Sequence, residues 1–477
     1  MDGLECSEIL LSDIDLGDRI DAEYFSKQYL EIEKRLSFVK TRKIGELSSA
    51  VASAFYPAAT QLYSIGDTAF IRCVDCVSYP VISTDQDAQF EKIPYSFAKQ
   101  NSGISLLKQH EIVITKVGTP CYASVLEGYD EVALSRTVLG LTQIKTVDPY
   151  YLMTFLRCKY GFGQLYRQRE LTIQYQLTLP RVKAVDVFLP SNAFQSSIVT
   201  LVKQYEHYMH TSVRHYRNAM SILMSNISSN LTLNESGVSV KTFSTSYAIT
   251  GRLDAEYYQP KYDGLFALLD GLPTKRLGEI MDIRKSIEPG SEYYGDEGVP
   301  FIRVSDVTKM GIDAPSIKIP ITTVPSIEKL YPKKDTILFS KDGSVGIAYK
   351  MEDDIDAVTS GALLHLRVKN TANVLPDYLT LVLNSEVVQL QAERDTNGAI
   401  IQHWKPGDIA NVVIPILPSD VQSEIARKVQ ESFSLRRQAE KLIETAVRAV
   451  EIAIEQDEAA AVEWLNTTTA YIIGESK

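Results

Sequence analysis

An internal repeat constrains the fold of this chain more than any other feature of the sequence. The clearest match is RIDAEYF at residues 19–25, which returns as RLDAEYY at residues 252–258. Five further segments match in the same order, at 44–47 and 277–280, 70–72 and 301–303, 112–116 and 337–341, 149–152 and 376–379, and 189–190 and 417–418. Because the order of all these matches is kept, the sequence predicts a duplicated chain with two similar units.

Each half ends in a stretch with the pattern of a long amphipathic helix. Both stretches open with Leu-Pro-Ser, and apolar residues then recur at steps of three and four. In the first stretch they are Ile198, Leu201, Val202, Tyr205, Tyr208, Met209, Tyr216, Ala219, Ile222 and Leu223, and in the second Ile425, Val429, Phe433, Ala439, Leu442, Ile443, Ala446, Val447, Val450 and Ile454. One apolar stripe per helix predicts an intramolecular helix pair. Asn192 with Gln195, and Ser419 with Gln422, have the spacing of capping pairs.

Short runs rich in Val, Ile, Phe and Thr predict strands between the matched segments. They lie at 68–75, 111–117, 122–126 and 137–144 in the first half, and at 300–307, 336–341, 345–350 and 362–368 in the second. A helix is predicted near 150–168 and another near 377–393. The expected organisation is a first domain over 1–190, a long helix over 191–228, a linker over 229–250, a second domain over 251–417 and a second long helix over 418–465. The predicted fold class is therefore α+β with an internal duplication.

Composition limits the class of protein. The chain has 477 residues, too many for one ordinary domain, and 45% hydrophobic with 23% charged residues is typical of globular proteins. No run of 18 apolar residues is present and the N-terminus lacks a signal peptide's basic start, so the expected location is the cytoplasm. The five cysteines fit a reducing compartment. The net charge of −11 does not exclude nucleic acid, because binding needs only one locally positive face, and residues 151–183 hold six cations against one acid.

The sequence carries no recognised catalytic motif. It has neither the Gly-Lys dipeptide of a phosphate-binding loop nor the Pro-Pro dipeptide of amino-methyltransferases, and its six histidines form no HExxH. Cys73 and Cys76 have CxxC spacing without a second pair, so we interpret them as a buried strand end and not as a metal site. His207 and His210 share a helix face without a third ligand. We therefore expect no catalytic residue, no metal and no cofactor in this chain.

The repeat, the Leu-Pro-Ser helix openings and the loop before the second helix together resemble the specificity subunit of type I restriction–modification systems. The most specific part is TNGAIIQ at 396–402, followed by VVIPILP at 412–418. Gln422 and Ile425 then match the family's helix, and Gln195 and Ile198 occupy the same places in the first half. The first-half loop at 170–174 lacks the family's glycine.

The resemblance implies a DNA-specificity subunit without catalysis of its own. Two α/β target-recognition domains would each read half of a split site in double-stranded DNA, and two long antiparallel helices would hold them apart in a pseudo-two-fold arrangement. Two DNA methyltransferase subunits carrying the methyl donor would dock on this frame, and restriction subunits with translocase and endonuclease activity would join them. Two other classes stay open: a restriction–modification enzyme with unrecognised motifs, and a scaffold that binds only protein.

Candidate DNA-binding residues are polar side chains in loops beside predicted strand ends, because cations meet phosphates while amides and Arg forks meet base edges. In the first half they are Lys116, Arg136, Arg167, Arg169, Gln174 and Gln176. In the second they are Lys341, Ser344, Arg394, Asn397, Gln402, His403 and Lys405. The alternative for each is a solvated charge, or an amide satisfied by its own loop. Arg72 and Arg303 are left open between DNA contact and a structural ion pair, whereas Arg19–Asp21 and Arg252–Asp254 favour a structural role because they recur unchanged.

Overall fold

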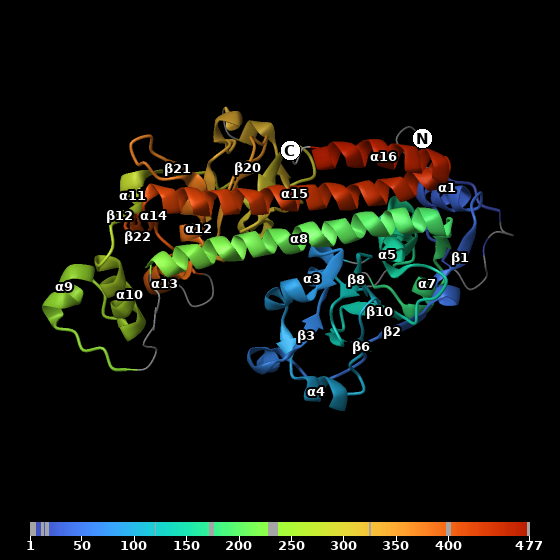
Figure 1. The fold of residues 1–477 in the computed structure, drawn as a ribbon, viewed down its shortest axis with the longest axis horizontal. Helices are drawn as coiled ribbons and strands as arrows, with labels where there is room; N and C mark the ends of the chain where they lie inside the picture. The colour runs from blue at the N-terminus through green and yellow to red at the C-terminus, as the bar shows by residue number, and fades with distance from the viewer. Residues whose placement is uncertain are drawn as a thin grey trace. The chain divides into compact units, whose positions relative to one another are not determined.

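The computed structural model describes residues 6–10, 14, 19–119, 121–170, 176–227, 237–323, 326–396 and 402–474. The chain forms two compact units, and Figure 1 shows the course of the chain through both. Each unit has its own hydrophobic core. The first unit contains Met1–His210 and Leu435–Lys477, and the second contains Thr211–Ser434. Among the described residues, no helix is long and apolar enough to cross a membrane.

Two sheets form the framework of the first unit. The larger sheet has the order β2-β10-β7-β8-β4, with strands at Ser49–Ala52, Val138–Thr142, Ile112–Thr115, Ala123–Glu127 and Val81–Ser83. The smaller sheet has the order β5-β3-β9-β6, with strands at Lys92–Ile93, Thr68–Ile71, Val132–Leu134 and Leu106–Leu107. β3 and β9 run parallel, whereas β7 is antiparallel to both β8 and β10. Every residue of β7 is buried, as expected of a short, continuous run of mainly apolar residues at the centre of a sheet.

The second unit repeats this topology. Its larger sheet has the order β13-β21-β18-β19, with strands at Met281–Lys285, Leu363–Val368, Ile337–Ser340 and Ala348–Lys350. Its smaller sheet has the order β17-β14-β20, with strands at Lys318–Ile319, Val299–Ile302 and Val358–Thr359, and β14 and β20 are parallel as β3 and β9 are. Both orders match the first unit strand for strand; the first unit adds β4 and β6, and the second adds the pair β15 (Val307–Thr308) and β16 (Gly311–Ile312). The predicted α+β class and internal duplication are therefore confirmed.

Each unit also contains a two-stranded ladder and two consecutive helices. The ladders pair β1 (Thr41–Lys43) with β11 (Asp186–Phe188), and β12 (Thr274–Arg276) with β22 (Val413–Pro415). The consecutive helices are α5 (Pro149–Arg157) and α6 (Lys159–Arg167), and α12 (Pro376–Leu383) and α13 (Glu386–Asp395). Further helices of the two units are α1 (Lys27–Leu36), α2 (Ile44–Leu47), α3 (Cys73–Ser78), α4 (Tyr95–Gln100), α7 (Leu179–Lys183), α9 (Tyr247–Thr250), α10 (Pro260–Asp270), α11 (Leu277–Ile280) and α14 (Pro406–Ala410).

The prediction of single helices over 150–168 and 377–393 is wrong at one point in each. Cys158 and Ser385 have an extended backbone, with ψ of 163° and 161°, and each starts a new helix. In the first unit the chain turns so tightly between α5 and α6 that a Cβ at Gly161 would lie 2.2 Å from the carbonyl oxygen of Phe155. Glycine, which has no Cβ, avoids this clash.

The two longest helices are α8 (Asn192–Ile227) and α15 (Ser419–Glu455), and each contributes one part to each unit (Figure 1). In the first unit the N–H of Ser191, just before α8, donates to Glu458, just after α15, at 2.9 Å. In the second unit Ser212 on α8 donates to the carbonyl of Ser432 on α15 at 2.8 Å. The position along α8 thus rises as the position along α15 falls, which confirms the antiparallel pair. The stripe is largely buried: Ile198, Val202, Ala446 and Val450 lie in the first core, and Ala219, Leu223, Ile425 and Val429 in the second.

The predicted end of the second long helix and one predicted strand in each unit differ from the structure; in the second unit the strand expected over 300–307 ends at Ile302. The helix expected over 418–465 stops at Glu455, and α16 (Glu458–Gly474) follows, because Asp457 caps the new helix by accepting a hydrogen bond from Ala460 at 2.8 Å. The strand expected over 68–75 ends at Ile71 and α3 begins at Cys73, so the CxxC pair lies on a short helix and not at a strand end. The linker expected over 229–250 falls partly outside the described residues, and α9 forms its last turn.

The predicted capping pairs have different partners in the structure. Ser191 caps α8 by accepting a hydrogen bond from the N–H of Phe194 at 3.2 Å, so Asn192 is not the cap. The Gln195 side chain instead accepts from the N–H of Asp148 at 3.1 Å, directly before α5. In the second unit the Gln422 side chain accepts in the same way from the N–H of Leu375, directly before α12, at 3.2 Å. Each glutamine therefore joins the start of a long helix to the start of a neighbouring helix.

Candidate nucleic-acid interface

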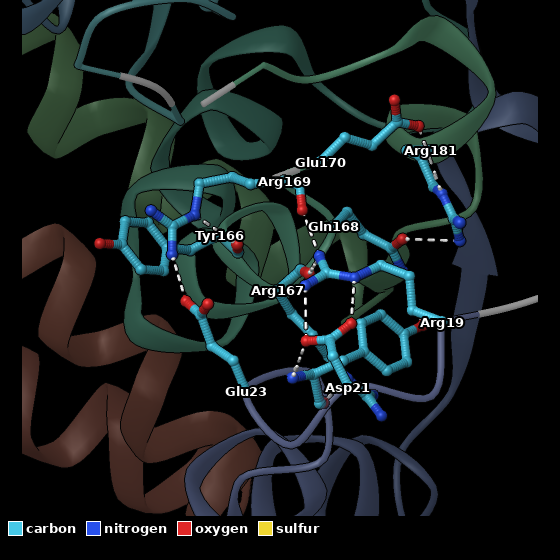
Figure 2. A network of polar contacts seen from close by, with 10 residues as sticks. Arg19, Asp21, Glu23, Tyr166, Arg167, Gln168, Arg169, Glu170 and Arg181 are labelled. Carbon is cyan, nitrogen blue, oxygen red and sulfur yellow. Dashed lines mark hydrogen bonds and ion pairs between the residues drawn. The ribbon is translucent and has the colours of Figure 1, made fainter. Parts of the chain in front are cut away.

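The repeated motif at 19–25 and 252–258 is an internal anchor in both units. Figure 2 shows Arg19 between the carboxylate of Asp21 and the main chain that follows α6. Arg19 donates to Asp21 at 2.6 Å and to the carbonyl of Arg167 at 3.3 Å, while Arg252 donates to Asp254 at 2.8 Å. The hydrogen bond from each Arg lowers the pKa of its Asp partner. The structural interpretation of both pairs is confirmed.

Two predicted DNA-binding arginines of the first unit belong to this anchor. Arg167 pairs with Glu33 at 3.0 Å, and its side chain is 12% exposed. Arg169 pairs with Glu23 at 2.9 Å, lies over the ring of Tyr166, and its side chain is 4% exposed (Figure 2). These internal partners favour a structural role for both side chains, and a DNA contact by either stays a prediction.

Arg394 occupies the corresponding place in the second unit. It pairs with Asp395 at 2.8 Å, and its guanidinium lies 4.2 Å from the centre of the Phe266 ring. Burial raises the pKa of Asp395, although the hydrogen bond from Arg394 opposes that shift. The geometry again favours a structural role, and a DNA contact by Arg394 stays a prediction.

The basic segment 151–183 does not present its cations as one free surface. Arg157 donates to the carbonyls of Cys76 at 2.6 Å and Ala123 at 2.5 Å, and burial lowers its pKa to about 10. Lys159 pairs with Glu455, and Arg181 donates to the side chain of Gln168 at 3.4 Å. Most of this positive charge therefore serves the packing of the first unit.

Three loops converge in the first unit, and we call residues 116–119, 135–137 and 176–177 the first loop pole. The N–H of Lys116, which follows β7, donates to the carbonyl of Thr137 at 2.9 Å. The N–H of Leu177 donates to the carbonyl of Lys116 at 3.0 Å. Main-chain hydrogen bonds thus hold the ends of distant segments side by side.

The second unit builds the same arrangement from residues 341–344, 360–362 and 402–404, the second loop pole. The N–H of Lys341, which follows β18, donates to the carbonyl of Ala362 at 2.9 Å. The N–H of Trp404 donates to the carbonyl of Lys341 at 2.8 Å, as Leu177 does to Lys116 in the first unit. The two poles are therefore equivalent places on the duplicated fold.

The first loop pole brings three candidates together. Lys116 is half-buried, burial lowers its pKa, and no carboxylate among the described residues pairs with it. Arg136 is exposed and lies 5.0 Å from the centre of the Tyr56 ring. Gln176 is exposed, and its main chain bridges to Val117. Gln174 lies outside the described residues.

The second loop pole brings four candidates together, with a fifth directly beside it. Lys341 is buried and pairs with Asp342, which also contacts Nδ1 of His403 at 2.9 Å. Ser344 and Gln402 are exposed, and the carbonyl of Gln402 accepts a hydrogen bond from Gly343 at 3.0 Å. Lys405, the exposed residue next to the pole, directly precedes α14. Asn397 lies outside the described residues.

Arg72 and Arg303 form ion pairs at matched positions. The main-chain N–H of each donates at 2.8 Å to an Asp three residues further on, Asp75 or Asp306. The guanidinium of Arg72 lies 3.6 Å from Asp75, and that of Arg303 lies 3.5 Å from Asp306. The guanidinium of Arg72 also lies 3.3 Å from Glu91. Of the two interpretations left open by the sequence, the ion pair is the one that the geometry supports.

Comparison with known protein families identifies one part of the chain. Residues 270–445 match the family model described as type I restriction modification DNA specificity domain. This stretch, from the end of α10 through most of α15, therefore belongs to that family of DNA-recognition domains. The predicted family and its sequence-specific DNA-recognition function are confirmed over this stretch. Comparison with curated proteins finds no match.

Solved structures similar to this chain include two specificity subunits. The type I restriction–modification S subunit from M. genitalium is 12% identical, with 89% of this chain and 95% of that chain covered and a TM-score of 0.36. The HsdS subunit from Thermoanaerobacter tengcongensis is 16% identical, with 88% and 97% covered and a TM-score of 0.29. At these scores the identification rests on the family model and not on the structural matches.

Proposed function

We propose that this chain is the DNA-specificity subunit of a type I restriction–modification complex. The observation that carries the proposal is the duplicated loop pole, because one copy lies in the stretch that matches a DNA specificity domain. Each pole would read one half of a bipartite site in double-stranded DNA. Two similar poles with different loop residues suit two different half-site sequences.

The chemistry of the pole residues suits the two parts of DNA recognition. Lys116 and Lys405 would contact phosphates, which fixes register without reading sequence. Arg136, Gln176, Gln402 and Ser344 have the donor and acceptor groups that read base edges. His403 is held by Asp342 at 2.9 Å, which favours a fixed orientation over a freely rotating side chain.

In this proposal catalysis belongs to the partners and not to this chain. Two DNA methyltransferase subunits would bind the methyl donor and use this chain for site selection, and restriction subunits would join the same complex. The work of such a complex on DNA places it in the cytoplasm. A modification enzyme with unrecognised motifs and a protein-only scaffold are the competing functions.

Co-expression with the cognate methyltransferase subunit tests the proposal. Sequencing of methylated DNA should reveal one bipartite site with an unspecified gap, and the methyltransferase subunit alone should not modify it. Methylation by the purified specificity chain without partner would instead favour the enzyme. A complex that forms but shows no salt-dependent binding to DNA would favour the scaffold.

A further inference from the structure

Strand register fixes which loop residues of the two units are equivalent. Leu141 of β10 pairs with both Ile112 and Ala50. Leu366 of β21 pairs in the same way with Ile337 and Ile283. Continuing the count past the ends of these strands aligns Phe55 with Glu288 and Arg136 with Gly361.

Phe55 is a solvent-exposed aromatic residue beside the first loop pole. Its side chain is 82% exposed, and the guanidinium of Arg136 lies 5.9 Å from the centre of its ring. Exposure of this much aromatic surface is unfavourable in water, so a partner that covers the ring would gain the free energy of its burial. Phe55 belongs to no motif in the sequence and is not one of the candidate DNA-binding residues.

The main chain around Phe55 is held in place. Its carbonyl oxygen packs so closely on Gly103 that a Cβ there would lie 2.1 Å away. The N–H of Ala54 donates to Gly103 at 2.7 Å, and Ser53 Oγ donates to the carbonyl of Leu134 at 2.7 Å. Phe55 therefore projects from a fixed support.

Arg136 is tied to the same support and leaves its guanidinium available. Its N–H donates to the hydroxyl of Tyr56 at 3.1 Å, and the guanidinium lies over the Tyr56 ring. Among the described residues no carboxylate pairs with it, in contrast to Arg167 and Arg169. A stacked, unpaired guanidinium keeps its donor fork for an external acceptor.

The aligned positions of the second unit have different chemistry. Glu288 is exposed and pairs with Lys285 at 2.9 Å. Gly361 donates to the carbonyl of Ile287 at 2.6 Å, and a Cβ on it would lie 2.6 Å from Glu288 Cγ. The pair of Phe55 and Arg136 in the first unit thus corresponds to Glu288 and Gly361 in the second unit.

We infer that these register-matched positions determine the different sequence preferences of the two units, and this inference rests on the proposed DNA-recognition function. In the first unit Arg136 donates its fork to N7 and O6 of a guanine in the major groove. Phe55 covers the C5-methyl group of a neighbouring thymine, the apolar feature of that base edge. Glu288 would accept from an exocyclic amine in the second half-site.

The test uses the complex with the methyltransferase subunit and the variants R136K and F55A. R136K keeps the charge but lacks the fork, so preference for guanine at one position of one half-site should fall about ten- to a hundred-fold. Replacement of that guanine by 7-deazaguanine should weaken methylation by the wild-type complex more than methylation by the R136K complex, because lysine lacks the fork that engages N7 and O6 together. Replacement of the adjacent thymine by uracil should do the same for the wild type and F55A.

Matched controls come from exposed residues of the same unit away from the pole. R42A removes an exposed Arg of β1, and F38A removes a Phe that is 75% exposed just after α1. Both should retain the wild-type preference at every position, and all variants should read the second half-site normally. R136K and F55A complexes with the wild-type preference at both half-sites would overturn the inference and leave the proposed function intact. A wild-type complex that modifies no bipartite site would overturn the proposed function itself.

Discussion

The matched glutamines Gln195 and Gln422 allow a quantitative test of how each recognition unit is joined to a long helix. Gln422 is 3% exposed, accepts from the N–H of Leu375 at 3.2 Å and donates to the carbonyl of Leu417 at 2.8 Å. Q422A removes both hydrogen bonds, each worth about 1 kcal/mol, and leaves two main-chain groups without this partner. We expect the second unit to lose about 2–4 kcal/mol of unfolding free energy.

Hydrogen exchange resolved by peptide measures this loss, because a protein with two units does not unfold in one cooperative step. Q422A should lower protection around α12 and the start of α15, and Q195A should lower it around α5 and the start of α8. Q28A, at an exposed position of α1, should change stability by no more than about 0.5 kcal/mol. A Q422A effect below about 0.5 kcal/mol, or one spread equally over both units, would refute the role of Gln422 in joining α15 to α12.

Four further outcomes are expected. Q402A should relax reading of one half-site by about 1–3 kcal/mol per lost base contact and leave the other intact, as sequencing of methylated sites would show. K116A should weaken binding to all sequences alike and lower the slope of log affinity against log salt by about 0.9, measured by titration at several salt concentrations. Burial lowers the pKa of His365 from 6.5 to about 4, so the unfolded state binds its proton first; stability present above pH 6.5 should fall by up to about 3 kcal/mol as the pH drops toward 4, and H365Q should flatten this dependence in acid denaturation. Matched four-residue insertions after His210 and after Ser434 lengthen each helix by about 6 Å and nearly one turn, so the unspecified gap should widen by one or two base pairs in the methylated sites, while an unchanged gap with activity retained would show that helix length does not set it.

The sequence predicted the parts of the fold that depend on repetition and periodicity. The ordered matches predicted two similar units, and the helical stripes predicted the buried faces of α8 and α15, because both signals are spread over many residues. The helix breaks at Cys158 and Ser385 were missed, since each depends on one residue with an extended backbone. The convergence of loops after β7 and β18 was only partly predictable, because main-chain hydrogen bonds leave no residue signature.

The site predictions failed where the deciding partner lies far away in the sequence. Arg167 and Arg169 have the local pattern of a basic surface, yet their acids Glu33 and Glu23 precede them by more than a hundred residues. Gln195 has the spacing of a capping residue, but its side chain accepts from Asp148. Local spacing predicts a role only when the competing partner is also local.

The comparison of the two units separates scaffold from recognition on physical grounds. Arg19 and Arg252 make equivalent hydrogen bonds in the two units, and so do Gln195 and Gln422. Each of these side chains holds together the same elements in its own unit. At the poles the main-chain hydrogen bonds are kept while the exposed side chains differ. Main-chain bonds do not depend on side-chain identity, so a pole can change its side chains without losing its support. A duplicated scaffold built in this way can acquire two sequence preferences at little cost in stability, since the residues that change are those that carry least of the packing.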